Sequence, residues 1–253
     1  MTTVLPREEE AYLGELVTRL TGNLGSRLVG VYLFGSASTS AYEPGRSDLD
    51  VQAVVEEPLT PGEKQAIIQR LTQQVLPCPA RKLEFVVYAR GSVNPASRHP
   101  RFEINLNTGP HEPDHVCLDP EGESSHWFLL DIAMGSASGR SLHGPAVADV
   151  FAPIPRRWTL EAIADSLEWH RANELTSANS VLNACRGWRY IATNTFGSKL
   201  AGAEWARQRE DCPAVVERAV AARKMGEALP AVDVGRLYDL VIAANRSALD
   251  EVI

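Results

Sequence analysis

Two short apolar runs joined by a polar segment restrict the fold of this 253-residue chain more than any other feature. The first run, 29–34, ends at Gly35-Ser36, and the second, 49–55, directly follows Asp48. Runs of β-branched and aromatic residues that are bounded by Gly, Ser and Asp are typical of buried strands. We therefore expect two strands whose polar ends meet at the loop between them.

The segments around these runs predict helices and a third strand. Apolar residues at i, i+3, i+4 and i+7 predict a first helix, formed by Leu13, Leu16, Val17 and Leu20. Pro61 opens a second helix, and 83–88 is a third apolar run. The order α-β-β-α-β indicates an α/β sheet domain of about 90–110 residues. The stretch 91–123 is rich in Pro, Gly, Asn and His, which predicts linker and irregular structure.

Beyond residue 123 almost every pattern is helical. Leu160, Ile163, Ala164 and Leu167 follow the helical spacing, and further helices are expected around 181–192 and from Ser198, Pro213 and Asp233. The predicted fold is therefore a mixed α/β sheet domain with flanking helices, residues 1–120, followed by an all-α helical bundle, residues 121–253.

Three carboxylates form the candidate chemical centre. Asp48 and Asp50 lie at i and i+2 at the start of a strand, so both should project from one face. Like charges this close repel unless a cation neutralises them, and Mg²⁺ prefers carboxylates together with phosphate oxygens. Glu84 stands in the third strand between Leu83 and Phe85, where a charge is unusual. If that strand neighbours the second, Glu84 can be a third metal contact or a general base; otherwise it is an edge residue facing solvent.

The end of the first strand is suited to bind an anion. Gly35 allows a close approach of the backbone to a ligand, and Ser36 offers a hydroxyl and an N–H to a phosphate. A bare D-x-D in a loop is more often a solvated turn or a helix cap. Its combination with Gly-Ser and with a carboxylate in a third strand favours a functional site.

The segments Phe34-Gly35-Ser36 and Ser47-Asp48-Leu49-Asp50 resemble the signature of the DNA-polymerase-β-type nucleotidyltransferases. Within that superfamily the chain resembles the streptomycin/spectinomycin (aminoglycoside) adenylyltransferases over roughly residues 26–210. That narrower resemblance rests on Leu142-His-Gly-Pro145, on Val150-Phe-Ala-Pro-Ile-Pro155, and on the segment 179–206 with Arg186, Lys199 and Glu204-Trp205-Ala206.

The resemblance implies a nucleotidyltransferase fold and an antibiotic-resistance enzyme that adenylylates a hydroxyl of an aminoglycoside or aminocyclitol with ATP and Mg²⁺. It implies that Ser36, Asp48 and Asp50 hold the triphosphate and metal and that Glu84 is the base. It further implies that Arg186 and Lys199 contact ATP phosphates. The spacing agrees, because a polar stripe at i, i+4, i+7 and i+11 is predicted for Asn179, Asn183, Arg186 and Tyr190.

Trp169 and Glu174 match, at the same spacing, a Trp and Asp pair through which streptomycin-accepting members bind drug. Here Glu replaces Asp, the following loop is shorter, and an aromatic residue aligned near Thr108 is missing. The acceptor is therefore open between a drug and a metabolite or protein hydroxyl. A further alternative is a nucleotide-binding sensor without catalysis.

The composition excludes several other classes of protein. Thirty-two acidic residues face 25 basic ones, for a net charge of −7, which argues against nucleic-acid and membrane-surface binding and suits a cationic small substrate. No signal-peptide pattern, membrane-length apolar run or paired cysteine motif is visible. We expect a cytoplasmic monomer that binds a nucleotide and a cationic small molecule.

The histidines are not expected to be metal ligands. The segment 111–115 fits H-E-x-x-H, but Pro110 and Pro113 exclude the helix that a zinc protease needs there. His126, His143 and His170 are predicted to be capping or surface residues.

Overall fold

The structure, a computed structural model, describes residues 5–223 and 226–252. The chain divides into two compact units, Met1–Ile154 and Pro155–Ile253. The sequence placed the division at residue 120. The first unit extends further because β6 (Arg140–His143) pairs antiparallel with β1 (Leu28–Phe34) and so joins the same sheet. Which residues make up the catalytic domain stays a prediction.

A mixed sheet forms the centre of the first unit. Its other elements are α1 (Arg7–Leu24), η1 (Gly25–Arg27), η2 (Gly35–Ser38), β2 (Leu49–Val55), α2 (Pro61–Leu71), β3 (Leu83–Ala89), α3 (Arg90–Val93), β4 (Phe102–Gly109), β5 (Glu112–Cys117), η3 (Pro120–Gly122), α4 (Ser125–Ser138) and α5 (Val147–Val150). In the described part of the chain six strands pair in the order β5-β4-β3-β2-β1-β6. The β2–β3 pair is parallel, with α2 in the connection between them, and the other pairs are antiparallel.

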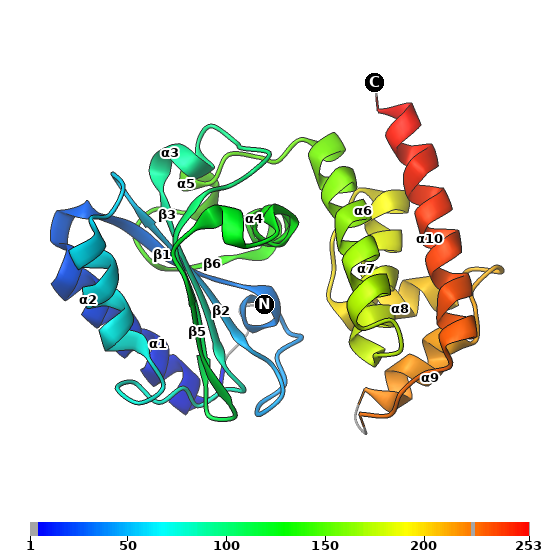
Figure 1. The fold of residues 1–253 in the computed structure, drawn as a ribbon, viewed down its shortest axis with the longest axis horizontal. Helices are drawn as coiled ribbons and strands as arrows, with labels where there is room; N and C mark the ends of the chain where they lie inside the picture. The colour runs from blue at the N-terminus through cyan, green and yellow to red at the C-terminus, as the bar shows by residue number, and fades with distance from the viewer. Residues whose placement is uncertain (1–4, 224–225, 253) are drawn as a thin grey trace. The chain divides into compact units, whose positions relative to one another are not determined.

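The two faces of the sheet are covered by different helices, α1 and α2 on one face and α4 on the other (Figure 1). Side chains alternate between faces along a strand. On β2, Val51 and Ala53 therefore pack in the core with α1 and α2, while Val54 packs in the core with α4. Asp50 has the same parity as Val54, so it lies on the α4 face.

A close approach brings α4 against the end of β1. A Cβ added at Gly135 of α4 would lie 2.2 Å from Cδ2 of Phe34, so only glycine fits there. Phe34 is the last residue of β1, directly before the Gly35-Ser36 turn. The helix is thereby packed beside the strand end that carries the candidate site.

Helix α2 begins where the sequence predicts. Pro61 is the first residue of α2, and Thr60 caps it, since its hydroxyl accepts from the Glu63 N–H at 3.3 Å. The Glu63 carboxylate in turn accepts from the Thr60 N–H at 2.8 Å. This capping box satisfies two backbone donors that the helix leaves open.

The prediction of irregular structure over 91–123 is wrong. That segment contains β4 and β5, which extend the sheet antiparallel beyond β3. Phe102, Ile104 and Leu106 alternate along β4 and are buried. Glu103, Asn105 and Asn107 stand between them, so β4 alternates apolar and polar residues and lacks the continuous apolar run of a central strand. Strand β5 is exposed along almost its whole length and lacks such a run too.

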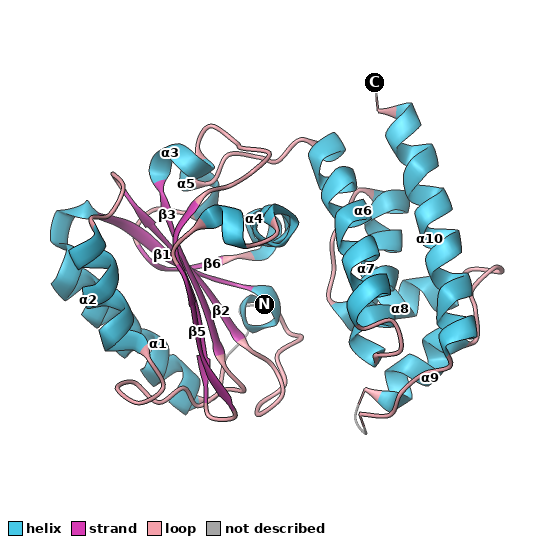
Figure 2. Cartoon of the chain, in the orientation of Figure 1, coloured by secondary structure: helices cyan, strands magenta, loops and turns pink. Residues whose placement is uncertain are grey.

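The second unit consists of helices joined by loops, with no strand among its described residues (Figure 2). Its elements are α6 (Arg156–Asn173), α7 (Ala178–Thr193), α8 (Lys199–Arg207), α9 (Val215–Ala222) and α10 (Ala231–Glu251). Helix α7 packs against each of the others. The predicted fold class, a mixed sheet unit followed by an all-α unit, is confirmed. Among the described residues, none of the helices is long and apolar enough to cross a bilayer.

Candidate active site

Asp50 and Glu84 lie side by side on the two parallel strands. The register pairs Asp50 of β2 with Glu84 of β3, and the same row continues to Phe34 on one side and to Asn107 on the other. Register partners project from the same face of a sheet. Of the two possibilities for Glu84, a neighbour of the second strand or an edge residue, the structure shows the first, and the Asp50 and Glu84 carboxylates share one face.

Gly35 is pressed against the Asp50 side chain. Its φ is +62°, and a Cβ built on it would lie 1.9 Å from Oδ2 of Asp50. Both the left-handed backbone and the contact therefore require glycine. Ser36 follows within the tight turn η2, where its carbonyl accepts from the Thr39 N–H at 3.1 Å. The turn thus brings backbone and hydroxyl groups to the carboxylate-bearing end of the sheet.

Two basic residues pair with the carboxylates, and the sequence reasoning missed both. Arg81 holds Asp48, the residue before β2, through two parallel bonds of 2.8 Å. Lys82 Nζ lies 2.8 Å from Oε1 of Glu84. Their position directly before the third strand was the available signal, because a parallel neighbour brings that end beside Asp48.

Burial and, after it, crowded negative charge determine the electrostatics of this group. Burial raises the pKa of Asp50 well above its usual range, and the nearby Glu84 and Asp131 carboxylates raise it further. Asp131 comes from α4, the helix packed at Phe34. Burial also raises the pKa of Asp48, although the Arg81 guanidinium opposes the shift. An additional cation at this end of the sheet would relieve the repulsion.

The residues fit a hard divalent ion by their donor chemistry. In the described part of the chain, no group of three or more His, Cys, Asp or Glu side chains is arranged to hold a metal ion. Asp48 and Glu84 are instead occupied by Arg81 and Lys82. The donors are nevertheless all carboxylate oxygens, and their repulsion at Asp50 is what a divalent cation would offset.

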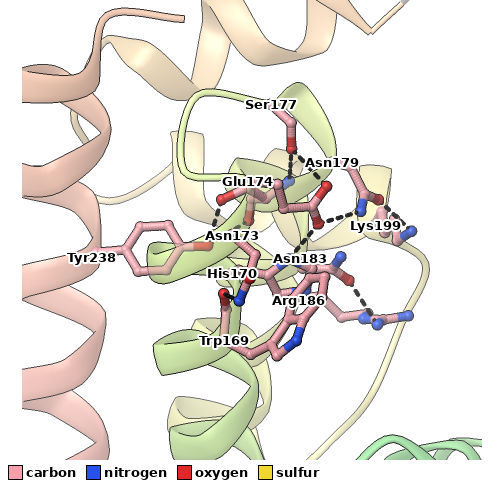
Figure 3. Close-up of polar contacts among 11 residues, drawn as sticks. Trp169, His170, Asn173, Glu174, Ser177, Asn179, Asn183, Arg186, Lys199 and Tyr238 are labelled. Carbon is pink, nitrogen blue, oxygen red and sulfur yellow. Dashed lines mark hydrogen bonds and ion pairs between the residues drawn. The ribbon is translucent and has the colours of Figure 1, made fainter.

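In the second unit Glu174 is the centre of a polar cluster, called here the Glu174 cluster (Figure 3). It comprises Trp169, His170, Glu174, Ser177, Asn179 and Lys199. The Glu174 carboxylate accepts from Ser177 Oγ at 3.3 Å and from Asn179 Nδ2 at 3.1 Å. Nδ1 of His170 contacts Oε1 of the same carboxylate. Trp169 packs against the His170 ring and is 39 % exposed, more than a core residue would be.

The cations expected to contact phosphates lie on α7 and at the start of α8. Lys199 Nζ donates to Asn179 Oδ1 at 2.6 Å, which links it to the Glu174 cluster. Arg186 donates to Asn183 Oδ1 at 2.8 Å. The predicted polar stripe is wrong at its last member, Tyr190. This residue is buried, and its ring stacks on the Phe196 ring with the ring centroids 4.1 Å apart.

The prediction that His126 and His170 are capping or surface residues is wrong as regards exposure, because both are almost fully buried. His170 is 3 % exposed and continues the apolar face of α6 after Ile163 and Leu167, a spacing visible in the sequence. The segment 111–115 lies in a turn and in β5 and is not helical, as expected.

The structure therefore brings the predicted residues together in two groups, one within each unit. Gly35, Asp48, Asp50 and Glu84 gather at one end of the sheet. Trp169, Glu174 and Lys199 gather in the helical unit, with Arg186 on the same helix as Asn179.

Comparison with known proteins agrees with this architecture. Residues 149–233 match the family described as aminoglycoside adenylyltransferase, C-terminal domain. A spectinomycin 9-adenylyltransferase of Staphylococcus aureus is 29% identical over 198 residues, 72% of this chain and 72% of that protein. An aminoglycoside (3'') (9) adenylyltransferase of Escherichia coli is 26% identical over 223 residues, 80% of this chain and 79% of that protein.

A solved structure shares the fold. The spectinomycin adenyltransferase AAD(9) of Enterococcus faecalis, crystallised with ATP and spectinomycin, superposes with a TM-score of 0.67 at 20% identity, covering 95% of this chain and 98% of that one. Together the matches identify the protein as a nucleotidyltransferase of the adenylyltransferase type. Residues 149–233 thus match the C-terminal domain of the aminoglycoside adenylyltransferases, and the chain is similar to adenylyltransferases over most of its length.

Proposed function

We propose that the protein transfers the adenylyl group of ATP to a hydroxyl of a cationic aminoglycoside or aminocyclitol. The observation that carries the proposal is the strand register that sets Asp50 beside Glu84, with Gly35 in contact with Asp50. This arrangement joins a candidate base, an anion-binding turn and metal-type carboxylates at one end of the sheet.

The reaction is an in-line displacement at the α-phosphorus. The acceptor oxygen forms a bond to the α-phosphorus, the bond from that phosphorus to the bridging oxygen breaks, and pyrophosphate leaves. Glu84 takes the proton of the acceptor hydroxyl. Because the attacking and leaving oxygens must be aligned, positioning supplies much of the rate.

The binding roles follow the chemistry of each group. Asp48, Asp50 and Glu84 would hold Mg²⁺, which supplies charge neutralisation of the phosphates. For that to happen Asp48 and Glu84 must exchange Arg81 and Lys82 for the ion. Gly35 and Ser36 bind the triphosphate through the turn, and Arg186 and Lys199 neutralise phosphate charge.

The acceptor is proposed to be cationic on three supports. The chain carries a net charge of −7. Trp169 is an exposed aromatic residue and Glu174 is a carboxylate, and each of these kinds of group favours ammonium or guanidinium ligands. The relatives are named for spectinomycin and for aminoglycosides.

The proposal is tested by pyrophosphate release with each common NTP and a panel of aminoglycosides and aminocyclitols, in Mg²⁺ and in EDTA. We expect release only with ATP, Mg²⁺ and a drug together. Release that no drug stimulates would favour a metabolite or protein acceptor. Tight ATP binding without turnover would instead indicate a nucleotide sensor, and either result would contradict the proposal.

Lys199→Gln should weaken nucleotide binding. Losing one charged contact to phosphate raises the KM for ATP by about tenfold, a loss of about 1.4 kcal/mol. The matched control is Arg171→Gln in the same unit, because Arg171 pairs with Asp239 at 2.9 Å on the surface. Equal KM values for ATP in Lys199→Gln and Arg171→Gln would remove Lys199 from the nucleotide site.

A further inference from the structure

His170 is placed directly behind the Glu174 carboxylate. It lies one helical turn before Glu174, is 3 % exposed, and its Nδ1 contacts Oε1 of Glu174. The Trp169 ring meets the imidazole edge-on, with centroids 5.2 Å apart and an interplanar angle of 85°. The backbone reinforces the pair, since the Glu174 N–H donates to the His170 carbonyl at 3.0 Å.

We propose that His170 is a positioning residue that holds the Glu174 carboxylate for a cationic acceptor and weakens acceptor binding when it becomes protonated. The inference rests on the proposed function, because it assumes that Glu174 faces the acceptor.

The neutral imidazole orients the carboxylate without cancelling its charge. Nδ1 of His170 contacts Oε1 of Glu174, and in the neutral ring the nitrogen that faces a carboxylate carries the hydrogen, so the contact is attractive without a second charge. Ser177 and Asn179 donate to the same carboxylate from the start of the next helix. Two neutral donors and the neutral imidazole therefore hold the carboxylate in place and leave its negative charge for a ligand cation.

Protonation of His170 would cancel the negative charge that Glu174 offers to a ligand. An imidazolium in contact with Glu174 forms an ion pair with it, and the net charge offered to the acceptor falls to zero. A buried charge so close is little screened by salt. Acceptor binding should therefore be lost as the pH falls through the pKa of His170.

The surroundings keep His170 neutral near pH 7. Burial lowers its pKa from the usual 6.5, the Glu174 carboxylate opposes the shift, and the cations Lys199 and Arg186 lower it further. These cations come from α8 and α7. From α10, Tyr238 donates to the Ser180 carbonyl and burial raises its pKa to about 12, so it stays neutral. Arg171 on α6 is paired with Asp239 of α10.

The test compares the intact protein with His170→Gln, which keeps an N–H donor and cannot titrate. The control is His126→Gln, the same change at a buried histidine of the first unit. Binding of streptomycin and of spectinomycin is measured by calorimetry from about pH 5 to pH 8 with an ATP analogue whose α–β link cannot be cleaved. Streptomycin is the sharper probe, because its guanidinium groups keep their charge over this range.

The expected result is an affinity that falls by up to about tenfold per pH unit below the pKa of His170 in the intact protein and in His126→Gln. In His170→Gln the affinity should be nearly independent of pH. An identical pH profile in all three proteins, or no binding of either compound at pH 8, would overturn the inference. Binding with this pH dependence but no pyrophosphate release would overturn the proposed function alone.

Discussion

Asp50→Asn should reduce pyrophosphate release by at least about 10³-fold while the protein stays folded. Asp50 is the carboxylate on which the negative charges of Glu84, Asp131 and Asp48 converge, so it is the group that most needs a cation. An amide at this position keeps the shape but no longer offers the charge. The measurement is the initial rate of release at saturating ATP, Mg²⁺ and acceptor.

The stability of the same variant should be equal to or greater than that of the intact protein. A carboxyl whose pKa is raised by folding binds its proton more readily in the folded state. Once the pH rises above 3.8, the pKa of this carboxyl in the unfolded chain, its ionisation therefore lowers the stability of the fold. Asparagine removes that penalty. The advantage of Asp50→Asn in melting temperature should therefore be largest at alkaline pH and shrink as the pH falls.

A metal readout separates this role from a general loss of structure. The melting temperature of the intact protein should rise with added Mg²⁺, because a ligand that binds only the folded state stabilises it. Asp50→Asn should lose this response, whereas Asp149→Asn, which changes an exposed aspartate on α5, should keep it. Full activity or an unchanged Mg²⁺ response in Asp50→Asn would remove Asp50 from the metal site.

The sequence predicted the parts of the fold that local signals mark. The strand Leu49–Val55 was predicted with its observed bounds, because Asp48 and the apolar run delimit it. Whether Glu84 neighbours Asp50 was left open by the sequence, and the parallel pairing of β2 with β3 answers it. The resemblance to the adenylyltransferases then supplied the roles that spacing alone could not.

The features that the sequence did not predict depend on contacts between segments that are distant in the sequence. Strand β6 is only four residues long and owes its place to β1, more than one hundred residues earlier. The ion pairs of Arg81 with Asp48 and of Lys82 with Glu84 become visible only once β2 and β3 lie in register. Contacts of this kind are set by tertiary packing, which local propensity does not encode.

The burial of His170 could have been predicted from the sequence, but the residue was interpreted wrongly as a capping or surface residue. It stands three residues after Leu167 on the buried face of α6 and four before Glu174. The helical spacing predicts the burial of His170 as clearly as it predicts the burial of Leu167. Its contact with Glu174 also depends on the end of α6, where Glu174 leaves the helical conformation as the C-cap.

Gly35→Ala should be as damaging to activity as the loss of Asp50, and it should also destabilise the fold. Two independent penalties act at this position: φ is +62°, and the new Cβ would lie 1.9 Å from Oδ2 and 2.7 Å from Cγ of Asp50. Either the turn or the carboxylate must move. We expect the free energy of unfolding in urea to fall by about 3 kcal/mol and pyrophosphate release to fall by at least about 10²-fold.

Gly45→Ala is the matched control for this experiment. Gly45 has a φ of +71°, but no heavy atom lies within 4 Å of the Cβ position, so its replacement carries the backbone strain alone, about 1 kcal/mol. The difference between the two variants therefore measures the contact with Asp50. A double-mutant cycle isolates it further, because Asp50→Ala removes the atoms with which the new methyl group collides. If Gly35→Ala destabilises the Asp50→Ala protein no more than Gly45→Ala does, the contact is the cause; equal penalties with and without Asp50 would show that the turn itself is strained.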